Sequence, residues 1–220
     1  MSLTLYFHPL SSFCHKALVA LYETGTPFTP RLVNLQDPAD KAAFQKIWPI
    51  GKFPVLRDDT KDRTLPESTI IIEHLAQHYP GKTALIPTDP DRATQTRLQD
   101  RVFDLYVHLP MQDIVGDRLR PPEQKSPTNV TQARARLETA YRMLDADMAG
   151  KTSAKTWAMG EDFTLADCAA CPALFYANKV MPFVGTHKTL TAYYERLIAR
   201  PSYARTLKEA EPYFQFFPKE

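Results

Sequence analysis

The chain has 220 residues, of which 44% are hydrophobic and 24% charged, and its formal net charge is +2. This composition excludes long disordered tracts, and the length suits one large domain or two smaller ones. The first eighty residues hold eight basic and eight acidic side chains, without the basic excess of a nucleic-acid-binding protein. We therefore expect no nucleic-acid partner.

The start of the sequence and the cysteine count indicate the compartment. Residues 1–5 run into a strand pattern without a basic or apolar leader, and nowhere do eighteen apolar residues run together. Three cysteines are too few, and odd in number, for a disulfide framework. We expect a soluble cytoplasmic protein with reduced thiols and no membrane association.

The first eighty residues alternate between strand and helix patterns. Residues 3–7 predict a strand, Ser11 and Ser12 offer the N-cap of a helix, and Gly25 ends that helix. Residues 28–32 predict a second strand, parallel to the first because a full helix separates the two. A short helix should follow Asp37, and another, with an apolar face, should begin at residues 67–68.

Between those two helices the sequence Gly51-Lys52-Phe53-Pro54-Val55-Leu56 predicts a short strand opened by a proline. Proline is rare at such a position unless its fixed φ and missing N–H are used, and only an X-Pro bond is cis at modest cost. We predict a cis Phe53–Pro54 bond that leaves the Phe53 backbone unpaired. An extended peptide laid beside this turn could pair with it, as an added strand does.

Beyond residue 80 the pattern changes. Prolines and a glycine over residues 80–90 indicate a linker, and all later periodic segments are helical. Those segments are residues 93–119, 131–148, 164–177, 190–199 and 203–210. Thr164 and Asp167 form the pattern of a capping box, which is the expected role of this carboxylate. Cys168 and Cys171 spell C-x-x-C, but within an apolar helix, so we expect them in the core.

The order of these elements resembles that of the cytosolic glutathione transferases over essentially the whole chain, in particular serine-type bacterial members of the theta-like and zeta-like classes. The motifs that carry the resemblance are Ser11-Ser12-Phe13-Cys14, Gly51-Lys52-Phe53-Pro54, Glu67-Ser68, and residues 160–167 with Pro172. The resemblance implies an α/β thioredoxin-like, glutathione-binding domain (residues 1–80), a linker (81–90) and an all-helical domain (91–220). It also implies a homodimer formed through the third and fourth helices, and a role in detoxification.

The resemblance also implies roles for single residues, with glutathione as co-substrate and no metal. Ser11 would contact the glutathione sulfur, and Lys52 would meet the glycine carboxylate. The Phe53 backbone, beside Pro54, would pair with the cysteinyl part, and Glu67 and Ser68 would hold the γ-glutamyl end. The chain has Trp48 where the family often has asparagine, and no tyrosine at the thiol-activating position of the tyrosine-type classes.

Several alternatives stay open. Ser11 could be a plain N-cap, Ser12 could take its chemical role, and Cys14 in the first turn could form mixed disulfides with glutathione. Cys14 would make the protein a glutathione-dependent thiol reductase or isomerase. A non-catalytic protein that binds glutathione or a hydrophobic ligand is the remaining alternative.

A small hydrophobic electrophile would need an apolar pocket between the two domains. The residues expected to line it are Leu10, Phe13, Tyr106 and Met111. The aromatic tail, residues 213–217, either covers this pocket or packs on the helical domain.

Overall fold

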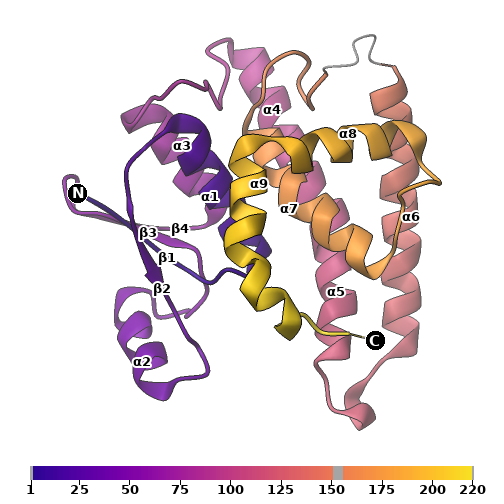
Figure 1. Ribbon diagram of the computed structural model, residues 1–220, viewed down its shortest axis with the longest axis horizontal. Coiled ribbons are helices and arrows are strands. Elements are labelled where there is room, and N and C mark those ends of the chain that lie inside the picture. Colours follow the sequence, from indigo (N-terminus) through magenta and orange to yellow (C-terminus); the bar gives the residue numbers. More distant parts are fainter. Residues whose placement is uncertain (1, 151–155, 220) are drawn as a thin grey trace.

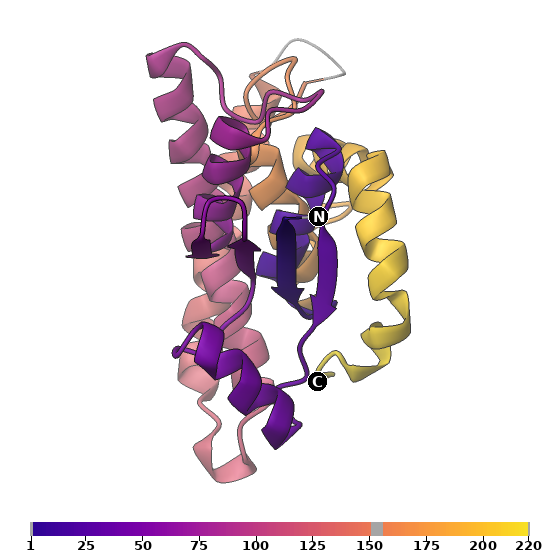
Figure 2. The same cartoon turned by 90° about the vertical axis from the view of Figure 1, so that its left-hand side faces the viewer.

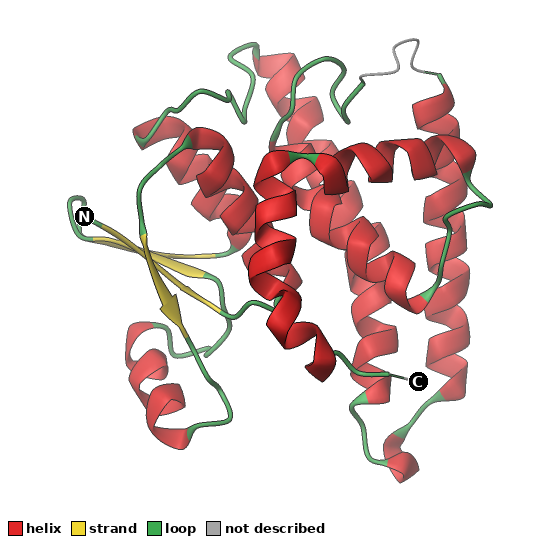
Figure 3. Ribbon diagram, in the orientation of Figure 1, coloured by secondary structure: helices red, strands yellow, loops and turns green. Residues whose placement is uncertain are grey.

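The computed structural model describes residues 2–150 and 156–219, and it contains a four-stranded sheet at one end of the chain. The strands are β1 (Leu3–Phe7), β2 (Thr29–Leu32), β3 (Val55–Asp58) and β4 (Arg63–Pro66), in the spatial order β2-β1-β3-β4. As predicted, β2 is parallel to β1, whereas β3 and β4 are antiparallel to their neighbours (Figure 3).

Three helices cover the sheet: α1 (Ser12–Thr24), α2 (Pro38–Ile47) and α3 (Ser68–His78). Successive strand residues point to opposite faces, so Leu5 and Leu56 share one core with α1 and α3. Tyr6 and Val55 pack instead with Phe44 of α2 on the other face. Figures 1 and 2 show α2 apart from α1 and α3 across the sheet. Both faces of the sheet are therefore covered.

In the described residues after β4 and α3, the regular structure is helical apart from an isolated bridge between Trp157 and Gly160. Its elements are α4 (Pro90–Val102), the π-helix η1 (Phe103–His108), α5 (Leu109–Arg118), the short 3₁₀ turn η2 (Pro122–Gln124), α6 (Pro127–Ala149), α7 (Leu165–Val180), α8 (Lys188–Ala199), α9 (Pro201–Ala210) and the 3₁₀ segment η3 (Glu211–Phe216). The sheet with its helices and this helical array confirm the predicted fold class.

The helix predicted over residues 93–119 begins earlier and is interrupted by η1. Pro110 cannot donate to the turn before it, and its ring clashes with a regular α-helical carbonyl. The chain widens there, and the Leu109 N–H bonds to the carbonyl of Asp104, five residues back. This π-segment carries Asp104 and His108, which are both buried.

Helix α1 joins the two parts of the molecule. It packs against α3 on the sheet side and against α7 and α9 on the helical side, as Figure 1 shows for α9. Its residues share one continuous core with Cys168 and Cys171 of α7, which confirms the core assignment of the C-x-x-C sequence. Among the described residues, no helix is both long and apolar enough to span a bilayer.

Candidate functional site

Ser11 is the N-cap of α1. Its backbone is extended, and its side-chain oxygen accepts a hydrogen bond from the Cys14 N–H at 3.3 Å. The side chain is half-buried. An N-cap bond uses a lone pair of the hydroxyl oxygen and leaves the hydroxyl proton free to be donated. The capping role of Ser11 and a chemical role are therefore compatible.

Ser12 lies in a different environment. It is 8% exposed, and its Oγ lies 2.5 Å from Nε2 of His108, a residue of the π-segment η1. Burial, with the positive charge of Lys16 and the nearby His15, lowers the pKa of His108 to about 3. The imidazole is therefore neutral at pH 7, and when Nε2 is its acceptor nitrogen, Ser12 donates its one proton to His108.

Phe13 and Cys14 complete the first turn of α1. The Phe13 ring stacks on His108 with ring centroids 4.1 Å apart and planes inclined by 10°. Cys14 has no exposed surface, and burial raises the pKa of its thiol to about 12. A buried thiol with a raised pKa is a poor nucleophile, because the thiolate is the reactive form.

The Phe53–Pro54 bond is cis, as predicted, and it directly precedes β3. Phe53 lies outside the pairing of β3 with its neighbours, and no hydrogen bond of its backbone is found within the described part of the chain. Lys52 is exposed. Trp48 is half-buried and packs with Phe53 in the small core beneath α2.

Two residues at the start of α3 line a cavity of about 370 Å³. Glu67 has φ +69°, a left-handed conformation that is rare for residues other than glycine, and Ser68 is 5% exposed. Phe13, Thr69, Arg101 and Asp104 line the same space, which we call the charged cavity. The positive end of the α3 dipole points toward ligands at this position.

A second cavity, of about 460 Å³, lies beside the Phe53–Pro54 turn. We call it the aromatic cavity, because four of its lining residues carry rings, namely His8, Phe53, Tyr213 and Phe216; Leu10 also lines it. The aromatic tail thus reaches this cavity through two of its side chains. Leu10 and Phe13, expected together, line different cavities.

The other two residues expected in the electrophile pocket are placed elsewhere. Met111 is 3% exposed and belongs to the main core, whereas Tyr106 is 57% exposed. Neither lines the aromatic or the charged cavity. Tyr106 lies within η1 and Met111 follows it, so the wide turn of this segment influences the direction of both side chains.

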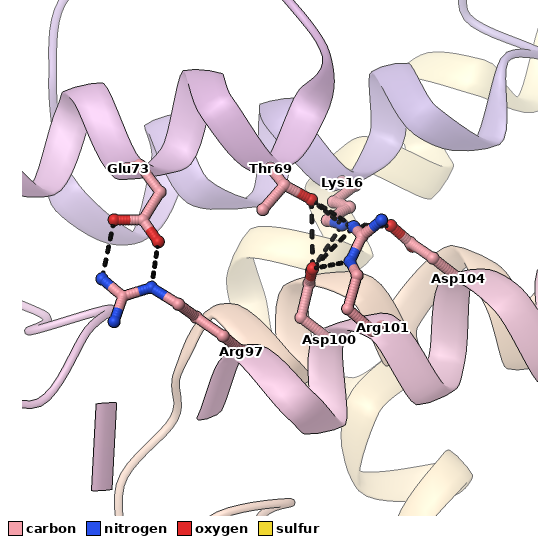
Figure 4. A network of polar contacts seen from close by, with 7 residues as sticks. All are labelled: Lys16, Thr69, Glu73, Arg97, Asp100, Arg101 and Asp104. Atoms are coloured by element: carbon pink, nitrogen blue, oxygen red, sulfur yellow. Dashed lines mark hydrogen bonds and ion pairs between the residues drawn. The ribbon is translucent and has the colours of Figure 1, made fainter. Parts of the chain in front are cut away.

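A buried polar network fixes α1 against η1 (Figure 4). Lys16 Nζ has no exposed surface and lies 2.5 Å from Asp100 and 2.8 Å from Asp104. Arg101 contacts both carboxylates, and Thr69 of α3 accepts from Lys16 at 2.8 Å. Burial, together with the charge of Asp100, raises the pKa of Asp104 although Lys16 opposes this. The network holds α1, α3, α4 and η1 together beside the charged cavity.

Sequence reasoning missed His8, His108 and Lys16. His8 directly follows the strand predicted over residues 3–7, in a segment that ends the strand pattern. The contact between Ser12 and His108 joins residues 96 positions apart, and no local pattern reports it. Lys16 could have been found, because it lies among apolar residues of a predicted helix. A lysine that is buried in such a helix almost always has a charged partner, so the sequence pattern indicates a buried ion pair. Within residues 2–150 and 156–219, no three potential metal ligands are grouped to hold an ion.

Comparison with known sequences identifies the family. The family model described as "Glutathione S-transferase, N-terminal domain" matches residues 5–83, and the one described as "Glutathione S-transferase, C-terminal domain" matches residues 110–201. The chain belongs to the glutathione S-transferase family. The predicted resemblance is thereby confirmed.

Similar sequences carry more than one kind of name. Glutathione S-transferase GstB of Escherichia coli (strain K12) is 25% identical over 201 residues, which are 91% of this chain and 95% of the relative. A stringent starvation protein A homolog of Coxiella burnetii is 27% identical over 215 residues, covering 95% of this chain and 93% of the relative. Family membership therefore does not by itself decide the activity.

Solved structures agree with the fold. A glutathione S-transferase from Methylobacillus flagellatus, crystallised with glutathione bound, has a TM-score of 0.82 at 25% identity and covers 93% of this chain and 98% of its own. Ure2p in complex with glutathione has a TM-score of 0.84 at 18% identity, with 94% of each chain covered, and supports the fold alone.

Proposed function

We propose that this protein is a glutathione transferase in which Ser11 stabilises the glutathione thiolate for attack on a small hydrophobic electrophile. The observation that carries the proposal is the division of labour among three candidates. Cys14 is fully buried with a raised pKa, and Ser12 bonds to His108, whereas Ser11 is half-buried and uses its oxygen, not its proton, in the N-cap bond to the Cys14 N–H. We expect residues 1–80 to form the glutathione-binding domain and residues 91–220 to complete the electrophile pocket, with residues 81–90 as the linker between the two domains. We also expect the protein to act in the cytoplasm.

Glutathione would lie along the Phe53–Pro54 turn. The Ser11 N–H donates to the His8 carbonyl at 3.0 Å, and the His8 ring stacks on Phe53 at 5.9 Å, so one residue ties the two features together. The exposed Lys52, which has no ion pair within the described residues, would meet the glycine carboxylate.

The γ-glutamyl end carries both a carboxylate and an ammonium group, and the charged cavity has groups for each. The N-terminal N–H groups of α3 and the Ser68 hydroxyl suit the carboxylate. Glu67 suits the ammonium group, and so does Asp104, whose Oδ1 is buried without a hydrogen-bond partner in the described part of the chain. Glutathione would thus be held at both ends, with its thiol at Ser11.

The contribution of Ser11 can be bounded. A thiol with a pKa of about 8.5 is only about 3% ionised at pH 7. A hydrogen bond from a hydroxyl plus the helix dipole lowers that pKa by about two units, which raises the thiolate fraction roughly 25-fold. Nucleophilicity falls with pKa at a slope of about 0.4 to 0.5, so about 8-fold is lost and the net gain is about threefold.

Most of the acceleration must therefore come from holding the electrophile next to the sulfur. With an aromatic halide, the thiol proton passes to solvent and the sulfur electron pair forms a C–S bond. The C–halogen bond breaks, and the halide leaves with its electron pair. The protein binds and orients both reactants in this reaction.

A conjugation assay with glutathione and 1-chloro-2,4-dinitrobenzene tests the proposal. We expect activity that falls in Ser11→Ala and persists in Cys14→Ala. Activity that survives Ser11→Ala and is lost in Cys14→Ala would instead support a thiol reductase or isomerase. Failure to bind immobilised glutathione would support a non-catalytic protein that binds a hydrophobic ligand. This alternative is worth testing because some similar sequences are named stringent starvation protein A homologs.

We also propose a homodimer through the α3 and α4 face. Ile70 is 49% exposed and lines the charged cavity beside Leu105 and Leu109, which are 41% and 42% exposed. Leu98 of α4 is 51% exposed. Grouped apolar side chains of this size commonly mark an interface. Sedimentation analysis should give about twice the chain mass, and Leu105→Glu with Ile70→Glu should give the monomer.

A further inference from the structure

The short loop between β1 and α1 runs from His8 to Ser11, so its backbone decides where the Ser11 side chain starts. A peptide group is planar, and only the dihedral angles on either side of it can rotate. A peptide group whose N–H and C=O are both held by hydrogen bonds therefore has little freedom left. Two such groups precede Ser11, and the partners of each determine how firmly Ser11 is placed.

The first peptide group, between Pro9 and Leu10, is held by two histidines. Its carbonyl lies 2.6 Å from Nε2 of His15, and its N–H donates to Nδ1 of His8 at 3.2 Å. His15 has no exposed surface, and burial lowers its pKa to about 4, so its ring is neutral at pH 7. Because a carbonyl can only accept, Nε2 of His15 carries the ring proton. Both partners thus come from the segment around Ser11.

The second peptide group, between Leu10 and Ser11, is held from two parts of the molecule. Its N–H donates to the His8 carbonyl at 3.0 Å, within the loop. Its carbonyl accepts from the hydroxyl of Tyr176 at 3.0 Å, and Tyr176 belongs to α7, 166 positions further along the chain. In the described part of the chain, this is the one side-chain hydrogen bond to the two peptide groups that comes from outside residues 8–15.

The hydroxyl of Tyr176 has little freedom of its own. The residue is 2% exposed, and its ring packs against those of His15 and Phe217, each with a centroid distance of 5.5 Å. A buried tyrosine hydroxyl needs a hydrogen-bond partner, which here is the Leu10 carbonyl. A phenylalanine would keep this packing and lose only the bond, so the hydroxyl can be tested separately from the ring.

We propose that Tyr176 is a positioning residue for Ser11: its hydroxyl fixes the Leu10–Ser11 peptide group, and through it the direction in which Ser11 donates its proton. This inference rests on the proposed function, since it concerns the bond from Ser11 to the glutathione sulfur. Tyr176 lines neither the aromatic nor the charged cavity, so it acts through Ser11. Hydrogen bonds weaken steeply as their angle departs from linear, and a small rotation of this peptide group is enough to weaken that bond.

Ultraviolet titration of the thiolate of bound glutathione in Tyr176→Phe tests this inference. The pKa of the bound thiol should rise by about half a unit, less than in Ser11→Ala, because the bond from Ser11 is weakened but not lost. In the double variant Ser11→Ala/Tyr176→Phe the pKa should equal that of Ser11→Ala, because Tyr176 acts through Ser11. A further rise in the double variant, as large as in Tyr176→Phe alone, would overturn the inference.

Tyr141→Phe provides the matched control. The Tyr141 hydroxyl donates to the Met181 carbonyl at 3.1 Å, a bond of the same kind between α6 and the end of α7, and Tyr141 lines neither cavity. Both variants should lower the midpoint of urea denaturation by a similar amount, whereas only Tyr176→Phe should change the thiol pKa. An unchanged thiol pKa in folded Tyr176→Phe would make Tyr176 a purely structural residue.

Amide hydrogen exchange separates this inference from the proposed function, since it needs no glutathione. The amides of Leu10 and Ser11 should exchange roughly fivefold faster in Tyr176→Phe than in the wild type, and should be unchanged in Tyr141→Phe. If Ser11→Ala leaves the thiol pKa unchanged, the proposed function is wrong, but faster exchange in Tyr176→Phe would still support Tyr176 as the residue that fixes this peptide group. Exchange at the wild-type rate in Tyr176→Phe would overturn the inference whatever Ser11 does.

Discussion

Helices α1 and α7 both begin at a hydroxyl N-cap, Ser11 in one and Thr164 in the other, yet their first turns are completed differently. At the third helical position α7 has Asp167, whose carboxylate accepts from the Thr164 N–H at 2.8 Å. At the same position α1 has Cys14, and its first turn carries no acidic residue. Because the first turn of α1 carries no acidic residue, its positive end favours an external anion such as the proposed glutathione thiolate.

The burial of the two helix starts follows from this difference. Asp167 has no exposed surface, and it also accepts from the Ala158 N–H and the Tyr193 hydroxyl, so the start of α7 is closed. Ser11 is half-buried between residues that line two cavities. One N-cap is part of the core, and the other is part of the proposed glutathione site. Mutations should therefore affect stability at α7 and chemistry at α1.

The largest effect is expected for Asp167→Ala. The change leaves two backbone N–H groups and two hydroxyls buried without their shared acceptor, and should lower the free energy of unfolding by about 4 kcal/mol. Urea denaturation measures this. Asp162→Ala is the matched control, since Asp162 is exposed in the same loop, and should change the free energy by less than about 0.5 kcal/mol. Similar losses for both variants would contradict the closed cap.

A smaller effect on the free energy of unfolding is expected from His108, whose hydrogen bond to Ser12 distinguishes that residue from Ser11. Its pKa in the folded protein, about 3, is below the ordinary value of 6.5, so the unfolded chain binds the proton first as the pH falls. Its stabilising contribution is complete above about pH 6.5 and is lost toward pH 3. Between pH 7 and 5 the wild type should lose about 2 kcal/mol through this residue.

His108→Gln removes that titration while keeping a side chain that can bond to Ser12. Urea denaturation at the two pH values should show a smaller loss in the variant. Part of the loss should remain, because burial also lowers the pKa of His15, to about 4. An identical pH dependence in the two proteins would show that His108 is not buried in its neutral form.

The smallest effect on stability is expected for Ser11→Ala, which removes one N-cap bond and should cost about 1 kcal/mol. Ser126→Ala is the matched control. Ser126 caps α6 in the same way, accepting from the Asn129 N–H at 3.4 Å, and should cost a similar amount. A loss near that of Asp167→Ala would make Ser11 a structural residue and would remove the contrast between the two helices.

The features that were predicted correctly depend on residues that lie close together in the sequence. The β1–α1–β2 unit, the cis Phe53–Pro54 bond and the pairing of Thr164 with Asp167 each depend on residues close together in sequence. The contact between Ser12 and His108 was missed because it joins residues 96 positions apart and depends on the π-segment η1, which precedes Pro110. Tyr106 belongs to the same segment and lines neither cavity.

The sequence left two positions open for the tail, because a run of aromatic residues does not show which rings face which way. In the 3₁₀ segment η3, residues three apart lie on one side, so Tyr213 and Phe216 line the aromatic cavity whereas Phe214 and Phe217 pack on α7. The sequence thus indicated which segments form the site, whereas the direction of single side chains depended on irregular helix geometry.

The most direct test of the account is an ultraviolet titration of the thiolate of bound glutathione in the wild type, Ser11→Ala and Ser12→Ala. We expect a bound-thiol pKa about two units below the free value in the wild type and in Ser12→Ala. In Ser11→Ala the pKa should rise by at least about one unit, because one charge-assisted hydrogen bond is lost. A pKa that rises in Ser12→Ala but not in Ser11→Ala would contradict the central claim that Ser11 is the hydroxyl that stabilises the thiolate.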